Sequence, residues 1–284
     1  MIKIKRSIYL LLISISISVH CIENIVVIIP SFNNATCYKK NLNSVFMQDH
    51  PQFRVIYIDD CSTDGTGNLV EQYIQDHQLH NQIQFIRNNY NRKALANIYA
   101  AVHTCADSDL IVLLDGDDAF AHAHVLSTIE RIHRERNAWV SYAQFINVPE
   151  HKAIECGIPV KGYAMVTPDV VIQEKSYRNC VWSWSGLRSF YAWIFKQIKQ
   201  EDLIDSRPPF EGKFFQVNYD NAIFFPLMEM AGIHCTFIEE VLLLRNVDTP
   251  LNDFKINLET SRDTRLYIRQ KPSYPTIITP IINS

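Results

Sequence analysis

Short apolar blocks alternate with amphipathic stretches between residues 25 and 135. The blocks are rich in β-branched residues and leucine, which predicts buried strands over residues 25–29, 53–58, 83–86 and 110–114. Apolar positions at helical spacing, with turn or capping residues before them, predict helices over residues 36–48, 66–77, 93–104 and 123–135. This order of elements predicts an α/β fold with a mainly parallel sheet and helices on both faces.

Polar residues follow three of the predicted strands directly. They occupy residues 30–32, 59–60 and 115–118. In a parallel sheet with right-handed crossovers, all loops from a strand to the next helix lie at one edge, and ligands bind there. We therefore expect these three loops to meet in one crevice.

The strand over residues 110–114 ends in an acidic cluster, Asp115-Gly-Asp-Asp118. Like charges at the end of a buried strand repel one another unless a cation lies between them, and a hard divalent ion such as Mg2+ or Mn2+ prefers oxygen ligands. Gly116 allows a ligand to approach the backbone closely. The alternative is an Asp-Gly surface turn.

Neither glycine-rich phosphate-binding motif is present, because no G-x-G-x-x-G follows a strand and no G-x-x-x-x-G-K-[ST] occurs. A phosphate would then have to be held through a metal. A carboxylate at the end of the second strand, Asp59 or Asp60, can accept a hydrogen bond from a base or a ribose hydroxyl. The pattern predicts a nucleoside diphosphate bound through a metal bridge.

The stretches at residues 26–33, 56–66 and 113–118 resemble, in order and in spacing, those of a family 2 glycosyltransferase of the GT-A fold. That fold is a Rossmann-like, mixed but mainly parallel sheet with helices on both faces, and the resemblance covers residues 24–250. It implies metal-dependent transfer of one hexosyl or N-acetylhexosaminyl group from a nucleotide-diphosphate sugar to a saccharide, lipid-linked or protein acceptor. The Q-x-x-R-W motif of processive synthases is missing. The alternative function is that of a non-catalytic module that binds a nucleotide sugar or a carbohydrate.

The resemblance also assigns residues to roles. Asp115 and Asp117 correspond to the D-x-D pair that holds Mn2+ or Mg2+, and Asp118 contacts the sugar or the metal. The residues implied in nucleotide binding are Pro30, Ser31, Phe32, Asp59, Asp60, Asp64 and Asp115. We expect residues 24–135 to form the nucleotide-sugar-binding half of one domain, residues 136–250 its acceptor-binding half, and residues 251–284 a C-terminal tail that is loosely ordered from Pro272 on.

The acceptor half is less regular. Residues 147–180 contain several prolines and glycines, which predicts a long mobile connection. Residues 181–193 hold three of the four tryptophans, among them Trp184. Their rings suit either stacking on an acceptor sugar or packing in the core, and Arg188 can hold a phosphate or a carboxylate.

Asp220 begins an apolar helix that ends near Gly232. A carboxylate at this place suits a helix cap. The resemblance instead implies the catalytic base of an inverting enzyme, although Tyr219 stands where the family usually has Glu. Glu229 is expected to be structural, and Arg245 is the nearest candidate for a contact to the phosphates.

The amino-acid composition limits the classes of binding partner that we expect for the protein. The formal net charge is −3 and no long basic run follows the first residues, which argues against nucleic acid as the main partner. The seven cysteines are scattered without a C-x-x-C pair, which predicts mostly reduced thiols.

The first 22 residues differ from the rest, because Lys3, Lys5 and Arg6 precede an apolar run over residues 8–19. This pattern suits a cleaved signal peptide, an uncleaved membrane anchor or neither. The first two would make the protein secretory or membrane-associated through its N-terminus, and the third would make it cytoplasmic.

Overall fold

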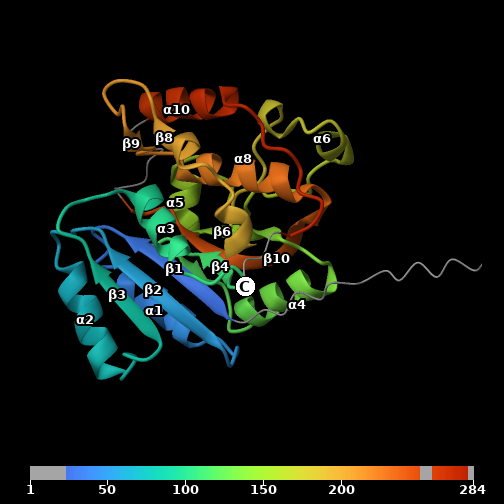
Figure 1. The fold of residues 1–284 in the computed structure, drawn as a ribbon. Coiled ribbons are helices and arrows are strands. Elements are labelled where there is room, and N and C mark those ends of the chain that lie inside the picture. The colour runs from blue at the N-terminus through green and yellow to red at the C-terminus, as the bar shows by residue number, and fades with distance from the viewer. Residues whose placement is uncertain (1–23, 250–257, 281–284) are drawn as a thin grey trace, which may run out of the picture.

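A computed structural model describes residues 24–249 and 258–280, so the predicted N-terminal segment lies outside the described residues. No helix within the described ranges is both long and apolar enough to cross a bilayer. Most strands belong to one eight-stranded sheet in the order β3-β2-β1-β4-β7-β6-β10-β5 (Figure 1). Its strands are β1 (Ile25–Ser31), β2 (Phe53–Asp59), β3 (Ile83–Arg87), β4 (Leu110–Leu113), β5 (Ala119–Phe120), β6 (Val140–Val148), β7 (Arg188–Tyr191) and β10 (Cys235–Asn246).

Helices follow the strands as the alternating pattern predicts. They are α1 (Tyr38–Phe46), α2 (Thr66–Asp76), α3 (Ala94–His103), α4 (Val125–Glu135), α5 (Glu150–Glu155), α6 (Asp169–Gln173), α7 (Ala192–Phe195), α8 (Tyr219–Ala231) and α10 (Leu258–Gln270). A small ribbon of β8 (Ile204–Asp205) and β9 (Lys213–Phe214) lies apart from the main sheet.

The first half of the sheet is parallel. Strand β1 pairs in parallel with β2 on one side and with β4 on the other, and β2 pairs in parallel with β3. Every residue of β1 and β4 is buried, as expected for continuous apolar strands covered on both faces. All four strands and four helices predicted between residues 25 and 135 are confirmed.

The second half makes the sheet mixed. Strand β7 inserts antiparallel between β4 and β6, and β6 and β10 pair in parallel. Strand β5 follows the acidic loop and pairs antiparallel with β10, at Leu243 and Leu244. The acidic loop is thereby fixed between the two halves of the sheet. The predicted α/β class with a mixed, mainly parallel sheet is confirmed.

The long connection predicted over residues 147–180 is present but partly regular. It contains α5, α6, a short 3-10 turn at Tyr177–Asn179 and an isolated bridge between Ile146 and Lys161. Apolar side chains such as Val171 and Tyr177 are buried against the body, and this burial orders the segment despite its prolines and glycines.

Helix α8 is almost wholly buried and contacts β6, α7 and α10 (Figure 1). Within it, Glu229 forms a buried ion pair with Arg178, at 2.6 Å from Nε to Oε1 and 2.9 Å from Nη2 to Oε2. Tyr274 donates its backbone N–H to the same carboxylate at 2.9 Å. Glu229 is therefore structural, as predicted.

The C-terminal tail lies against the body within its described part, including residues after Pro272 that were expected to be loosely ordered. Its described part contains helix α10, and Ile277 donates its backbone N–H to the carbonyl of Met230 at 2.9 Å. The tail packs on α8 because that helix is apolar on nearly all sides and must be covered.

Candidate active site

The three polar loops meet at the carboxyl ends of β1, β2 and β4, as predicted. Gly116 donates its N–H to the carbonyl of Pro30 at 3.1 Å, and Asp60 donates its N–H to the carbonyl of Ser31 at 2.8 Å. A Cβ atom on Gly116 would lie 2.6 Å from the Ser31 side chain. Only glycine allows the acidic loop to approach β1 this closely.

The predicted nucleotide-binding residues on β1 are partly occupied by internal contacts. The Ser31 hydroxyl is buried and accepts hydrogen bonds from Tyr57 at 2.9 Å and from Asn34 Nδ2 at 3.0 Å. Pro30 is buried within β1, and Phe32 is half-buried at its end. Ser31 thus fixes the loop, and contacts of Pro30, Ser31 and Phe32 with a nucleotide remain a prediction.

The acids after β2 hold loop backbones together. Asp60 accepts from the N–H groups of Arg92 and Lys93, both at 2.8 Å. Asp64 accepts from the N–H of Ala35 at 2.9 Å, and so joins the loop after β2 to the loop after β1. These hydrogen bonds shape the rim of the crevice, and Asp60 has little capacity left for a base or a ribose.

Asp59 is also engaged within the protein. It accepts from the N–H of Ser62 at 3.2 Å and lies 3.8 Å from Arg87 Nε. Its side chain is buried, so it could reach a nucleotide only if the neighbouring loop moved, and its contact with a nucleotide stays a prediction.

The acidic loop concentrates three carboxylates, of which Asp118 is buried and Asp115 and Asp117 are half-buried. Burial, and then the charge of Asp115, raises the pKa of Asp117 to about 7. Burial also raises the pKa of Asp115, and burial with the charges of Asp117 and Asp115 raises that of Asp118 well above its usual value. Each rise means that negative charge is disfavoured here unless positive charge is added.

A divalent cation fits this loop. Within residues 24–249 and 258–280, no three side chains of His, Cys, Asp or Glu form a ready-made metal site. Ions such as Mg2+ are commonly bound by one or two carboxylates, with substrate phosphates and water as the other ligands. Asp115 and Asp117 meet that requirement, and the raised pKa values show why the pair would gain from a cation.

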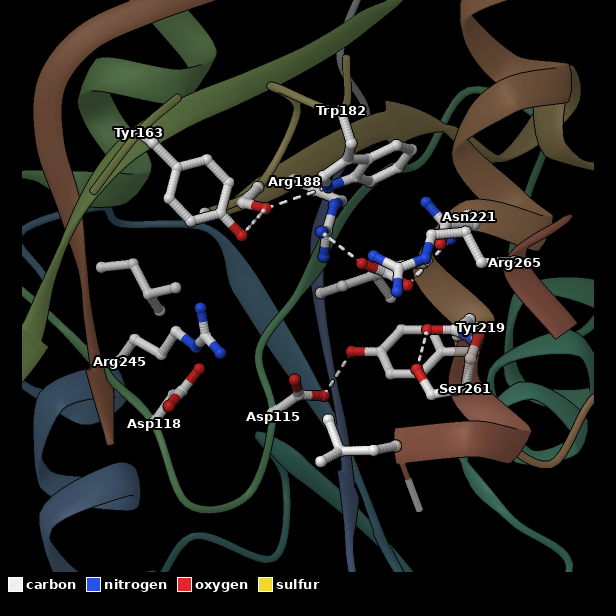
Figure 2. A pocket seen from close by; sticks show the side chains of 17 residues that line it. Asp115, Asp118, Tyr163, Trp182, Arg188, Tyr219, Asn221, Arg245, Ser261 and Arg265 are labelled. Atoms are coloured by element: carbon white, nitrogen blue, oxygen red, sulfur yellow. Dashed lines mark hydrogen bonds and ion pairs between the residues drawn. The ribbon is translucent and has the colours of Figure 1, made fainter. Parts of the chain in front are cut away.

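A cavity of about 300 Å3 opens beside the acidic loop. Its walls come from β4, β7, α8, β10 and α10, which are far apart in the sequence (Figure 2). The charged and phenolic residues that line it near the loop are Asp115, Asp118, Arg188, Tyr219, Asp220 and Arg245. Asp117 does not line this cavity.

Two contacts in the cavity hold the start of α8, one to the acidic loop and one to β7. The Tyr219 hydroxyl donates to Asp115 Oδ1 at 2.6 Å, and Arg188 Nη2 lies 3.3 Å from Asp220 Oδ2 (Figure 2). Burial and the charge of Asp115 raise the pKa of Tyr219 well above its usual value, so the phenol remains a donor. Asp115 and Asp220 are thus brought to one cavity although 105 positions separate them in sequence (220 − 115 = 105).

Arg245 lies on the other side of the cavity, with its guanidinium turned toward the carboxylate of Asp118 (Figure 2). Its charge partly opposes the rise in the pKa of Asp118. Asn246 donates its backbone N–H to Asp118 Oδ1 at 2.7 Å, which fixes the end of β10 against the acidic loop.

Trp184 is not an acceptor-binding residue. Its ring is fully buried, and its Nε1 donates to Thr167 Oγ1 at 2.8 Å. Besides Tyr219, the aromatic residues that line the cavity are Trp182 and Tyr163. The cluster of tryptophans indicated a segment that reaches the cavity, but nothing in the pattern distinguished Trp182 from its buried neighbour.

Sequence reasoning also missed polar residues of the cavity. They are Ser185, Asn218, Asn221, Ser261 and Arg265. Asn218 precedes the predicted helix that begins at Asp220, and Ser185 lies within the tryptophan-rich segment. Both were therefore next to features that the sequence marked. Ser261 and Arg265 lie on α10, where no motif marked them.

Comparisons with known proteins agree with this arrangement. Residues 26–154 match the model of the family described as Glycosyl transferase family 2. The putative teichuronic acid biosynthesis glycosyltransferase TuaG of Bacillus subtilis is 33% identical over 93 residues, which is 32% of this chain and 35% of TuaG. The poly(ribitol-phosphate) beta-N-acetylglucosaminyltransferase TarS of Staphylococcus aureus is 31% identical over 94 residues, which is 32% of this chain and 16% of TarS.

Solved structures extend the similarity beyond the matched segment. The crystal structure of S. aureus TarS 1–349 in complex with UDP-GlcNAc has a TM-score of 0.55 at 17% identity, covering 80% of this chain and 59% of that chain. The mannosyltransferase PcManGT of Pyrobaculum calidifontis, in complex with GDP-Man and Mn2+, has a TM-score of 0.52 at 14% identity, covering 80% and 58%. These identities show a shared fold. The chain spans about a third or less of the curated relatives described above.

Proposed function

Residues 26–154 belong to glycosyl transferase family 2 within a chain of the GT-A fold, and on this premise we propose that the protein transfers one sugar from a nucleoside-diphosphate sugar to an acceptor hydroxyl. The donor is a UDP- or GDP-linked hexose or N-acetylhexosamine. UDP-N-acetylglucosamine is the first donor to test, because TarS was solved with it. The acceptor is a saccharide or a polyol, in keeping with the polymers named for TuaG and TarS.

One observation carries this proposal: Asp115 and Asp220 line the same cavity, where Tyr219, the neighbour of Asp220, donates to Asp115 and Arg188 pairs with Asp220. A sugar transferase needs positive charge at the leaving diphosphate and a base at the incoming hydroxyl. Residues 24–135 would supply the first site and residues 136–250, with α10 added, the second.

On the donor side, Asp115 and Asp117 would hold Mn2+ or Mg2+, which when bound offsets the negative charge that develops on the leaving diphosphate. Arg245 supplies further positive charge from β10. Asp118 holds the end of β10 through its hydrogen bond to Asn246, and so sets the distance of Arg245 from the acidic loop.

On the acceptor side, Asp220 is the general base. The acceptor oxygen attacks the anomeric carbon, the bond from that carbon to the diphosphate oxygen breaks, and the hydroxyl proton passes to the Asp220 carboxylate. Attack on the face opposite the leaving group inverts the configuration. Arg188 and the N–H of Asn221, which donates to Asp220 Oδ1 at 2.9 Å, orient the carboxylate.

The substitution Asp220→Asn tests the assignment, because it preserves shape and removes the base. We expect the turnover of donor and acceptor to fall about 1,000-fold, within the usual range for general-base catalysis. Affinity for UDP with Mn2+, measured by calorimetry, should change little. Normal turnover by the variant would refute the role of Asp220.

The same assay addresses the non-catalytic alternative. A binding module would bind UDP with Mn2+ and release no UDP from a donor, with or without acceptor. Turnover by the wild-type chain that requires Asp220 excludes that function.

A further inference from the structure

Helix α10 turns one face toward the cavity. Leu258, Ser261 and Arg265 line it, and their spacing of three and four residues places them on one side of a helix. The family match ends at residue 154, so this face belongs to the part of the chain that the family model does not describe.

The helix is fixed to the body and holds this face in place. Asn218 Nδ2 donates to the Ser261 carbonyl at 2.5 Å, and Ser261 Oγ donates to Asn218 Oδ1 at 3.0 Å. Further along, Arg178 Nη1 donates to the carbonyl of Ile268 at 2.7 Å. Asn218 immediately precedes α8, so the position of α10 is coupled to the helix that carries Asp220.

The three arginines of the cavity differ in their surroundings. Arg188 pairs with Asp220, and Arg245 is directed at Asp118. Arg265 is exposed and lines the cavity. Among the residues that the structure describes, no acidic side chain forms an ion pair with it.

Arg265 and Arg245 occupy different sides of the cavity. Figure 2 shows Arg245 beside Asp118 and the acidic loop, whereas Arg265 lies with Asn221 at the start of α8. A diphosphate held at the acidic loop therefore has Arg245 beside it, and Arg265 is on the side of the proposed base.

An aromatic pair also lines the cavity. Trp182 Nε1 donates to Ser185 Oγ at 3.0 Å, and Ser185 Oγ donates to the Tyr163 hydroxyl at 3.2 Å. This chain of hydrogen bonds fixes two rings whose faces suit the C–H groups of a sugar or a polyol.

We propose that Arg265 is a specificity-determining residue that binds a phosphate or a carboxylate on the acceptor. The inference rests on the proposed function, because it takes the Asp220 side of the cavity as the acceptor site. Arginine suits this task because its planar guanidinium binds phosphate and carboxylate oxygens in a bidentate manner.

The test compares Arg265→Gln with Arg262→Gln. Arg262 is an exposed arginine of the same helix that does not line the cavity, so both substitutions remove one positive charge from α10. Ligand-detected NMR would measure the binding of sn-glycerol 3-phosphate, of glycerol and of UDP with Mn2+ to the full chain and to both variants.

We expect Arg265→Gln to weaken the binding of glycerol 3-phosphate by about 10-fold or more, as expected for the loss of charge-assisted hydrogen bonds. UDP with Mn2+ should bind to both variants as to the parent, and Arg262→Gln should leave all ligands unaffected. Glycerol should bind the parent more weakly than its phosphate does.

Other outcomes overturn the inference in distinguishable ways. Equal effects of the two substitutions would mean that only the net charge of α10 matters. Loss of UDP affinity in Arg265→Gln alone would assign the anion to the donor diphosphate. If the parent binds glycerol no more weakly than glycerol 3-phosphate, the cavity has no anion site, whereas failure to bind UDP would overturn the proposed function itself.

Discussion

The two halves of the domain build their parts of the site in different ways. In residues 24–135, the site residues lie at the ends of strands or in the loops that follow them, and the loops bind one another through backbone groups, as Asp60 and Asp64 do. In residues 136–280, the charged site side chains extend from regular elements, with Arg188 on β7, Asp220 on α8 and Arg265 on α10.

This difference matches the different requirements of donor binding and acceptor binding. A diphosphate and its cation are similar in every donor, and a rigid set of loops can hold them without variation. An acceptor differs between enzymes, and side chains on separate elements can be exchanged without disturbing the sheet. The first half should therefore tolerate few changes, and the second half should determine which acceptor is used.

The largest effect should come from the acidic loop. We expect Asp115→Asn to lower the rate of sugar transfer by about 1,000-fold or more, because the variant loses charge where the diphosphate is stabilised. The same substitution should weaken Mn2+-dependent binding of UDP, which calorimetry in the presence and absence of Mn2+ would measure.

Asp76→Asn is the control for this prediction. Asp76 is exposed at the end of α2, where it accepts a hydrogen bond from Gln72 at 2.7 Å. It should leave transfer unchanged. Full transfer and intact Mn2+-dependent binding in Asp115→Asn would show that the first half does not hold the donor in this way.

The same difference explains which parts of the molecule the sequence predicts. The loops of the first half follow strands with clear hydrophobic patterns, and their key contacts join segments that the fold class already places side by side. Asp115, Asp117 and Asp118 could therefore be grouped with residues 30–32 from the sequence, and the structure places these loops in contact.

The second half depends on contacts that no local pattern encodes. Whether Trp182 or Trp184 faces the cavity is decided by the elements that pack around them. In the sequence, both belong to the same tryptophan-rich segment, so the sequence does not distinguish them. Arg265 lies 45 positions after Asp220 (265 − 220 = 45), on a helix within the segment that was assigned to the C-terminal tail. Its place in the cavity follows from the burial of α8, which required α10 as a cover.

A smaller effect, on the pH dependence of the free energy of unfolding, should come from a buried histidine that joins the two halves of the domain. His133 on α4 contacts the carbonyl of Ala138 through Nδ1 at 2.9 Å and the Ser189 hydroxyl through Nε2 at 2.8 Å. A carbonyl only accepts, so Nδ1 carries the proton and Nε2 accepts. Burial lowers the pKa of His133 to about 4 from an ordinary value of 6.5.

The unfolded chain therefore binds a proton at this histidine first as the pH falls. The free energy of unfolding is therefore highest above pH 6.5. It falls progressively between pH 6.5 and 4, by about 3 kcal/mol for a shift of this size. Urea unfolding between pH 7 and 4.5 would measure it. His133→Gln should flatten this dependence, whereas His80→Gln, at an exposed histidine, should retain it. Equal slopes in the two variants would contradict the prediction.

The smallest effect should come from the hydrogen bond that joins the halves inside the cavity. Tyr219→Phe removes only the hydroxyl that donates to Asp115 at 2.6 Å. We expect transfer to fall about 10-fold, corresponding to roughly 1.5 kcal/mol for a hydrogen bond to a charged group. The Mn2+ concentration needed for half-maximal rate should also change, because the orientation of Asp115 depends on this contact.

Tyr267→Phe is the matched control, because it removes a hydroxyl that contacts Ser206 at 2.6 Å outside the cavity. If both phenylalanine variants transfer sugar with the same rate and the same Mn2+ dependence, Tyr219 only packs against the acidic loop. A change confined to Tyr219→Phe would mean that α8 positions the donor site as well as the proposed base, so that the two halves act as one site.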